Sequence, residues 1–147
     1  MSRAQVELVQ LEATRYIGIA VTSSLRSVEG VAEAHQQFLN RMSEIPDRID
    51  DSTYVCVHFA NEILFTYLYC MEVTSLDSIP VGMIGFEVPA RQYVKVHSNG
   101  QEPYSFVEKY LQERGLRSDS NALAFERFQF GKAETKYHAE ILVPFTI

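Results

Sequence analysis

The chain has 147 residues, of which 46% are hydrophobic, and it carries a formal net charge of −6. This length and composition favour one folded domain with a substantial core and argue against a disordered chain. An acidic chain with no run of Lys or Arg is poorly suited to neutralising phosphates, so we expect no direct nucleic-acid partner. Its apolar runs, such as YIGIAV, are far shorter than the roughly 20 residues that cross a bilayer, and no signal peptide is evident. We therefore expect a cytoplasmic protein without a membrane partner.

The first half of the chain is predicted to contain two strands, a helix and a further pair of strands. The strand-like runs stand at 6–11, 15–21, 53–59 and 64–73. Over 27–45, apolar side chains recur at spacings of three and four and form one stripe, which is typical of a helix with a single buried face, and Pro46 ends it. The short segment ANEI separates the last two strands and predicts a hairpin.

The second half repeats this order. Its strand-like runs stand at 83–88, 92–98, 121–130 and 136–145. A helix is predicted over 103–115, with Pro103 near its start and Gly115 just past its end. Aligning Tyr93 with Tyr16 gives an offset of 93 − 16 = 77 residues that also matches several neighbouring positions. We therefore predict a single domain over 1–147 that contains an internal repeat of about 6–74 and 83–145.

This duplication predicts an α+β fold of two strand-helix-strand-strand units related by a pseudo-twofold axis. Each helix has one apolar stripe to bury, so both helices should lie on one side of an antiparallel sheet. The opposite side would then be free for a ligand cleft. Alternation within the strands places Tyr16 and Tyr93 on that free face, and it groups Tyr67 and Tyr69 on one face of their strand.

A carboxylate stands within the aromatic strand ALAFERFQF. Alternation places Glu126 on the same face as Phe128 and opposite Arg127. One interpretation is an edge strand in which Glu126 meets water or pairs with Arg127 or Lys132. The other is a carboxylate at the floor of an aromatic cleft, held for a cation, because an unpaired buried charge is costly. Coulomb attraction and cation–π contact, the latter worth about 0.5–2 kcal/mol, would then favour lipophilic cations.

Cysteine and histidine patterns give no sign of a metal or cofactor. Cys56 and Cys70 lie on separate predicted strands without a C-x-x-C spacing, so we expect reduced, buried thiols. No two histidines stand at the i, i+4 spacing that would place both on one helix face as metal ligands. The G-x-G-x-x-G, P-loop and G-x-S-x-G motifs do not occur, so we expect no cofactor.

Several stretches resemble the GyrI-like, or AraC-type, effector-binding family. VPARQYVKVHSNG, FERF and AEILVPF are similar to family patterns that run roughly iPA..YA.f.h.G, fE.Y and tEi.iPv, and FTYLYCMEV is similar to..Y..GvEV. The resemblance covers nearly the whole chain and implies a pseudo-twofold fold with a small-molecule cleft. It also implies that Glu126, the glutamate of fE.Y, attracts lipophilic cations into an aromatic pocket. This chain departs from the family at Phe128, where tyrosine is common, and in having no tryptophan.

We therefore expect a promiscuous small-molecule binding protein rather than an enzyme. The candidate ligand-binding residues are Glu126, Tyr16, Tyr67, Tyr69, Tyr93 and Phe128. The duplicated fold uses all 147 residues and leaves none for a helix-turn-helix, which predicts a stand-alone effector-binding domain. A role in drug sensing or transcription regulation would then need a protein partner, and a homodimer is left open.

Two alternative functions follow from the same resemblance. Some GyrI-like proteins hydrolyse reactive small molecules, and here Glu126 would be the general base, with Tyr93 or Tyr67 beside it. The other alternative, a protein inhibitor of a larger enzyme such as gyrase, rests on the family name and the acidic composition.

Overall fold

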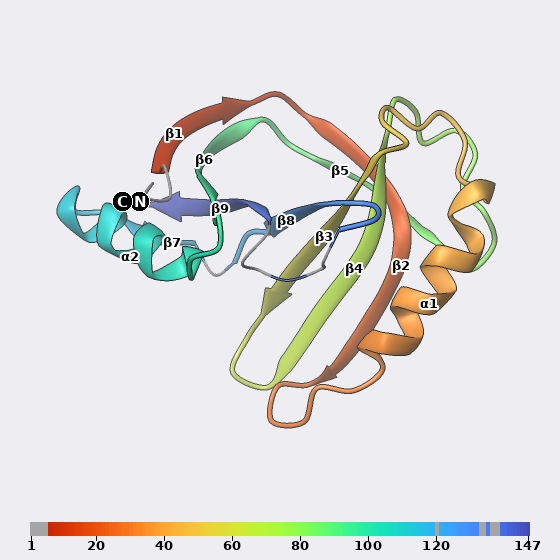
Figure 1. The fold of residues 1–147 in the computed structure, drawn as a ribbon, viewed down its shortest axis with the longest axis horizontal. Helices are drawn as coiled ribbons and strands as arrows, with labels where there is room; N and C mark the ends of the chain where they lie inside the picture. The colour runs from red at the N-terminus through yellow and green to blue at the C-terminus, as the bar shows by residue number, and fades with distance from the viewer. Residues whose placement is uncertain (1–5, 120, 133–134, 136–138) are drawn as a thin grey trace.

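A computed structural model describes residues 6–119, 121–132, 135 and 139–147 of the chain (Figure 1). Its helices are α1 (Val31–Arg41) and α2 (Pro103–Glu113), with a 3-10 turn at Met42–Glu44. Its strands are β1 (Val6–Leu11), β2 (Thr14–Ser24), β3 (Thr53–Ala60), β4 (Leu64–Val73), β5 (Ile84–Val88), β6 (Arg91–His97), β7 (Arg117–Ser118), β8 (Ala124–Gln129) and β9 (Glu140–Thr146). The predicted α+β fold, with an antiparallel sheet and two helices, is confirmed.

The order of the strands in the sheet is symmetric. It runs β1-β6-β9-β8-β3-β4-β2-β5, with β7 beside β9, and the pairs in it are antiparallel. Matching β1 with β5, β2 with β6, β3 with β8 and β4 with β9 reverses the order onto itself. The pseudo-twofold axis therefore passes between β3 and β8, and we propose that the two halves, about 6–74 and 83–145, arose by duplication.

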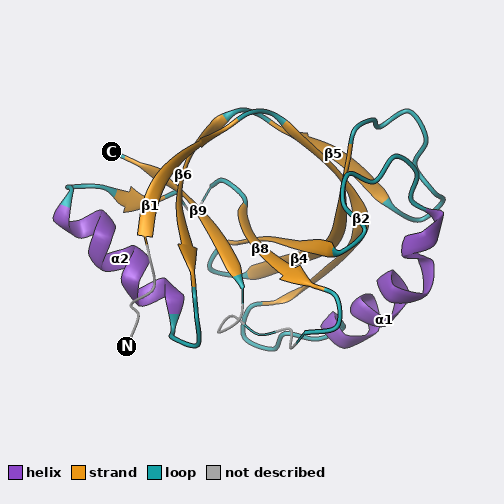
Figure 2. Cartoon of the chain, turned by 45° about the horizontal axis from the view of Figure 1, so that its top comes forward, coloured by secondary structure: helices purple, strands orange, loops and turns teal. Residues whose placement is uncertain are grey.

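Two long segments join the halves as one ribbon. β1 continues into β2 and β5 continues into β6, and one antiparallel register runs from Val6 opposite Val96 to Gly18 opposite Ile84. Strand pairing is interrupted at 12–13 and at 89–90, where Pro89 has no N–H to donate. Figure 2 shows the ribbon arching over β8 and β4 at this point. The ribbon thus covers one face of the sheet, which we call the ribbon face.

The opposite face packs against both helices, and we call it the helix face. The helices bury Ala34, Phe38, Val107 and Leu111 against it. The ribbon face has its own buried layer, which includes Tyr16, Val57, Tyr93, Phe125 and Leu142. Because side chains alternate along each strand, every central strand contributes to both layers. Each helix buries one side against the helix face, which accounts for the single apolar stripe predicted from its sequence.

Three local features differ from, or add to, the sequence analysis. The helix expected from 27 begins at Val31, because Gly30 before it has φ of 82°, in the left-handed region that glycine tolerates. The last strand is described from Glu140, and 136–138 of the predicted run lie outside the described residues. Cys56 and Cys70 are both buried, but they belong to opposite faces of the sheet.

In the part of the chain that is described, no helix has the length and apolar character to cross a membrane.

Gly18 marks the closest approach between β2 and β4. A Cβ atom there would overlap the carbonyl oxygen of Tyr69 and would lie 2.7 Å from the Cα of Cys70. Both obstacles are backbone atoms of the paired strand, so neither can rotate away. The neighbouring Gly85 differs, because an added Cβ would meet Cδ1 of Ile79 at 2.5 Å, which is the mobile end of a side chain.

We expect Gly18→Ala to lower the free energy of unfolding by about 3 kcal/mol, the upper range for overpacking a well-packed interior. Gly85→Ala, the matched control, should change it by less than about 1 kcal/mol, because Ile79 can move and alanine restricts the unfolded chain. Urea unfolding of both variants measures the difference. Equal effects of the two substitutions would contradict the predicted strand contact.

Candidate functional site

Glu126 lies on the helix face, at the centre of the sheet. Its Oε1 accepts a hydrogen bond from the Tyr67 hydroxyl at 3.0 Å, and its Oε2 accepts one from the Tyr104 hydroxyl at 2.5 Å. Tyr67 reaches across from β4, two strands away, and Tyr104 comes down from the first turn of α2. Two charge-assisted hydrogen bonds offset part of the cost of placing this carboxylate away from water.

The start of α2 fixes the position of Tyr104. Glu102 is the N-cap residue, and its carboxylate accepts hydrogen bonds from the backbone N–H groups of Tyr104 at 3.3 Å and Ser105 at 2.8 Å. Pro103 occupies the first helical position, where its missing N–H is harmless. Tyr104 then shares a helix side with Val107 and Leu111, which are buried against the sheet. The capping sequence therefore fixes the start of α2, and with it the direction of the Tyr104 side chain toward Glu126.

Aromatic side chains surround this carboxylate on the helix face. The Tyr67 ring lies 5.2 Å from that of Tyr69, nearly edge to face, and 6.0 Å from that of His58. His35 of α1 stacks on Tyr69 with ring centroids 4.6 Å apart and only 5° between their planes. Both helices thus contribute a ring beside the sheet. We call the set of His35, His58, Tyr67, Tyr69, Tyr104 and Glu126 the glutamate cluster.

Burial determines the protonation of the groups next to Glu126. Burial, and then the nearby Cys56 and Glu126, raise the pKa of the Tyr67 phenol well above its usual range. Burial and the Glu126 carboxylate do the same to the pKa of Tyr104. Both phenols therefore stay protonated and act as donors near neutral pH. Burial lowers the pKa of His58, against a smaller opposing effect of Glu126, so His58 is neutral.

The described residues offer no metal centre. They contain no group of three or more His, Cys, Asp or Glu side chains placed to hold an ion. The cluster instead offers one carboxylate, hydroxyl donors and aromatic faces, which together suit an organic cation.

Comparison with known proteins assigns the chain to a family. The family of integron-associated effector-binding proteins, Cass2, matches residues 7–144. The protein is a member of the Cass2 family. No curated protein sequence matches this chain.

Solved structures share the fold at low sequence identity. The integron cassette protein VCH_CASS2 of Vibrio cholerae has a TM-score of 0.63 and 12% identity, over 96% of this chain and 95% of its own. SAV2435 bound to tetraphenylphosphonium has a TM-score of 0.64 and 16% identity, over 97% of this chain and 94% of its own. EcmrR in its DNA complex has a TM-score of 0.64 and 14% identity, over 97% of this chain but only 57% of its own. These likenesses support the effector-binding fold of this Cass2 member.

The structure divides the residues predicted for the site between the two faces of the sheet. Glu126, Tyr67, Tyr69 and Phe128 share the helix face, although Phe128 is 3% exposed and packs on Tyr54. Tyr16 and Tyr93 lie on the ribbon face, 1% and 2% exposed, where each ring contacts Phe125. Their placement in a cleft with Glu126 is wrong, because the ribbon covers that face and buries both rings. Arg127 also points to the ribbon face, where it pairs with Glu140 at 3.0 Å.

Sequence reasoning missed three members of the cluster. Tyr104 carried a usable signal, because it precedes Val107 by three residues and Leu111 by seven, the spacing of one helix side. His35 was placed in the apolar stripe of the first predicted helix, and His58 was considered only as a metal ligand. Their stacking on tyrosines depends on how α1 and β3 meet β4, which no local pattern reveals.

We expect His58 to make the free energy of unfolding fall with acidification. The pKa of His58 lies below its ordinary value of 6.5 in the folded protein, so below pH 6.5 the unfolded chain binds a proton that the folded chain does not. The stability that the folded protein gains with a neutral His58 is present above pH 6.5, and it is lost as the pH falls toward the pKa of His58 in the folded protein. Relative to His58→Phe, wild type should lose stability between pH 7 and pH 5.

Urea unfolding across this pH range tests the prediction, and NMR titration of the His58 ring protons gives a second measurement. A constant stability difference would show that folding leaves the pKa of His58 unchanged, and a difference that grows in favour of wild type at low pH would show that folding raises it; either result would contradict the prediction.

Proposed function

We propose that this protein binds lipophilic organic cations at the glutamate cluster. The observation that carries the proposal is the uncompensated charge of Glu126. Among the described residues, no Lys, Arg or His side chain forms a salt bridge with it. Its two hydrogen-bond donors, the Tyr67 and Tyr104 hydroxyls, are neutral. A part-buried carboxylate with only neutral partners is a site that a cation stabilises.

The rings of the cluster determine which cations suit the site. Tyr67 and Tyr69 present aromatic faces and edges beside the carboxylate, and cation–π contact adds about 0.5–2 kcal/mol per favourable ring. Flat rings discriminate weakly between ligand shapes, so several lipophilic cations should bind. A small hydrated ion such as Na⁺ would gain little, because it would exchange water for aromatic carbon.

Relatives of the same fold support this function. SAV2435 has been solved with tetraphenylphosphonium, a lipophilic cation, and EcmrR has been solved as a complex with DNA. We extend to this chain only the binding of a lipophilic cation, and not the binding of DNA. The bound state would serve sensing, through a protein partner, or sequestration of the compound.

We expect Glu126→Gln to weaken tetraphenylphosphonium binding by about 1–3 kcal/mol, roughly 5- to 100-fold. Glutamine keeps the size and the acceptor oxygen but removes the charge, so binding of the neutral triphenylphosphine oxide should change little. Glu87→Gln is the matched control, because it removes one negative charge from an exposed pair with Arg15 at 2.9 Å, away from the cluster. Isothermal titration of the three proteins with both ligands measures these differences.

Two results would overturn the proposal. Equal weakening of both ligands would mean that Glu126 contributes only packing. If Glu87→Gln weakened cation binding as much as Glu126→Gln does, the overall charge of the protein, and not the cluster, would attract the cation.

A further inference from the structure

A second cavity lies at the bend between β5 and β6, away from the glutamate cluster. Its volume is about 730 Å³, and its walls come from 87–93, 121–123, Gln10 and Phe145. Small-molecule sites commonly have volumes of about 300–1,000 Å³, so the space suits an organic molecule. Arg91 and Tyr93 point to the ribbon face, opposite Glu126, so the sheet separates the two sites.

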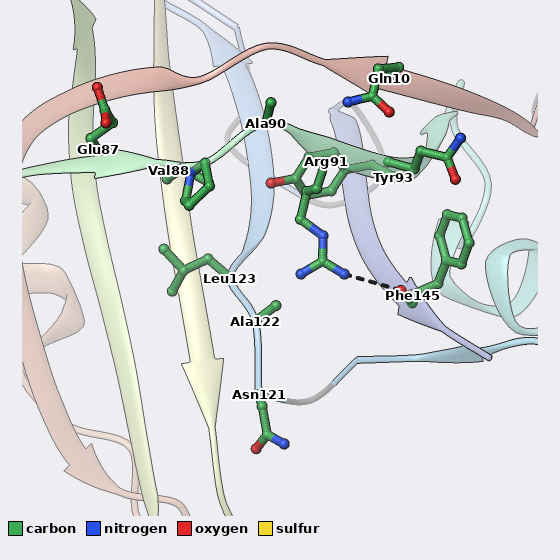
Figure 3. Close-up of a pocket in the computed structure, with 12 residues that line it drawn as sticks. Gln10, Glu87, Val88, Ala90, Arg91, Tyr93, Asn121, Ala122, Leu123 and Phe145 are labelled. Atoms are coloured by element: carbon green, nitrogen blue, oxygen red, sulfur yellow. Dashed lines mark hydrogen bonds between the residues drawn. The ribbon is translucent and has the colours of Figure 1, made fainter.

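Arg91 is held in the wall of this cavity. Its Nη2 donates to the carbonyl oxygen of Phe145 at 3.1 Å and lies 3.5 Å from Oδ2 of Asp119. Its guanidinium carbon lies 5.8 Å from the centre of the Tyr93 ring. Figure 3 shows the side chain reaching from the bend toward Ala122, with one terminal nitrogen of the guanidinium hydrogen-bonded to Phe145. The group is therefore positioned before any ligand arrives.

The cavity wall holds one guanidinium and one carboxylate. Arg91 and Glu87 are the charged side chains among its described lining residues. Glu87 pairs with Arg15 at 2.9 Å, and Figure 3 shows it directed away from Arg91. The remaining wall combines apolar surface from Val88, Pro89, Leu123 and Phe145 with the side-chain amides of Gln10, Gln92 and Asn121. The combination is one fixed cation beside a hydrophobic surface.

We propose that this cavity is a second ligand site, for small organic carboxylates with a flat apolar body. A guanidinium binds a carboxylate through charge-assisted N–H donors. The hydrogen bonds of Arg91 to described residues come from Nη2, which leaves the N–H groups of Nη1 for a ligand. Leu123 and Val88 then pack against the body of the ligand. This site and the glutamate cluster select opposite charges.

The first half of the duplicated fold provides an internal comparison. Near the start of β3 and the end of β4, which match the strand ends beside the second cavity, the cavity has a volume of only about 160 Å³. The arginine that lines it, Arg127, comes from β8 of the second half and lies between two carboxylates, 3.8 Å from Glu72 and 3.0 Å from Glu140. Arg91 has one carboxylate neighbour, at 3.5 Å, and a larger space in front of it. Of these two cavities, the one beside Arg91 combines more room with the less neutralised guanidinium.

NMR and isothermal titration of the full chain with indole-3-acetate and its neutral analogue indole-3-acetamide test this site. We expect saturable binding of the acid, with amide shifts at 88–93 and 121–123, and at least about tenfold weaker binding of the amide. Arg91→Gln should weaken the binding of indole-3-acetate by a similar factor. Arg15→Gln, which removes one positive charge from the exposed pair with Glu87, should not.

Two further measurements keep the test decisive. Ala122→Glu would place a competing carboxylate in the cavity and should abolish binding of the acid even if Arg91→Gln fails to fold. Saturating tetraphenylphosphonium should leave the affinity for indole-3-acetate unchanged, so this result stands whether or not the glutamate cluster binds cations. Absence of saturable binding up to about 10 mM, equal affinity for acid and amide, or shifts centred on Tyr67 and Tyr104 would each overturn the second site.

Discussion

The antiparallel ribbon of β1–β2 with β5–β6 is the constraint on which the rest of the structure depends. One register runs through both halves, so neither half can shift along the other without breaking every pair from Val6 to Gly18. The ribbon also arches over one face of the sheet and buries Tyr16 and Tyr93 there. With that face closed, a site at the centre of the sheet has to lie on the helix face.

The helices leave the centre of the helix face to polar and aromatic side chains. α1 packs over β2 and β4, and α2 packs beside β1, β6, β7 and β9, so the two helices lie toward opposite ends of the sheet (Figure 1). β3 and β8 meet between them and contribute His58 and Glu126. Tyr67 and Tyr104 reach this centre from opposite sides. Hydrogen bonds from two neutral donors hold the carboxylate in place without neutralising it, which keeps its charge available to a ligand.

Local sequence patterns predicted the helices and strands, and they predicted which side chains of a strand share a face. Alternation correctly grouped Tyr67 with Tyr69 and separated Glu126 from Arg127, because the side-chain period of a strand is two. Periodicity alone does not tell which face of a sheet a ligand meets. The expectation that the helices fill their face placed the predicted cleft with Tyr16 and Tyr93. Which tyrosines lie on the same face as Glu126 depends on where the ribbon crosses the sheet, and that crossing is a pairing between 6–18 and 84–96 that no local window contains. Tyr104 was missed for a related reason, because its partner Glu126 lies 22 residues farther along the chain.

The ribbon also means that each half lends a strand to the other. β1 belongs to the first half in sequence but pairs with β6, and β5 belongs to the second half but pairs with β2. Such reciprocal exchange resembles a strand-swapped dimer joined into one chain, which is the arrangement that the proposed duplication predicts. Val6 must find Val96 across 96 − 6 = 90 residues of chain, so closure of the ribbon carries a high loop entropy and depends on the second half having been synthesised. Each half therefore relies on a strand of the other to pair its edge, and loss of either half would leave that edge unpaired.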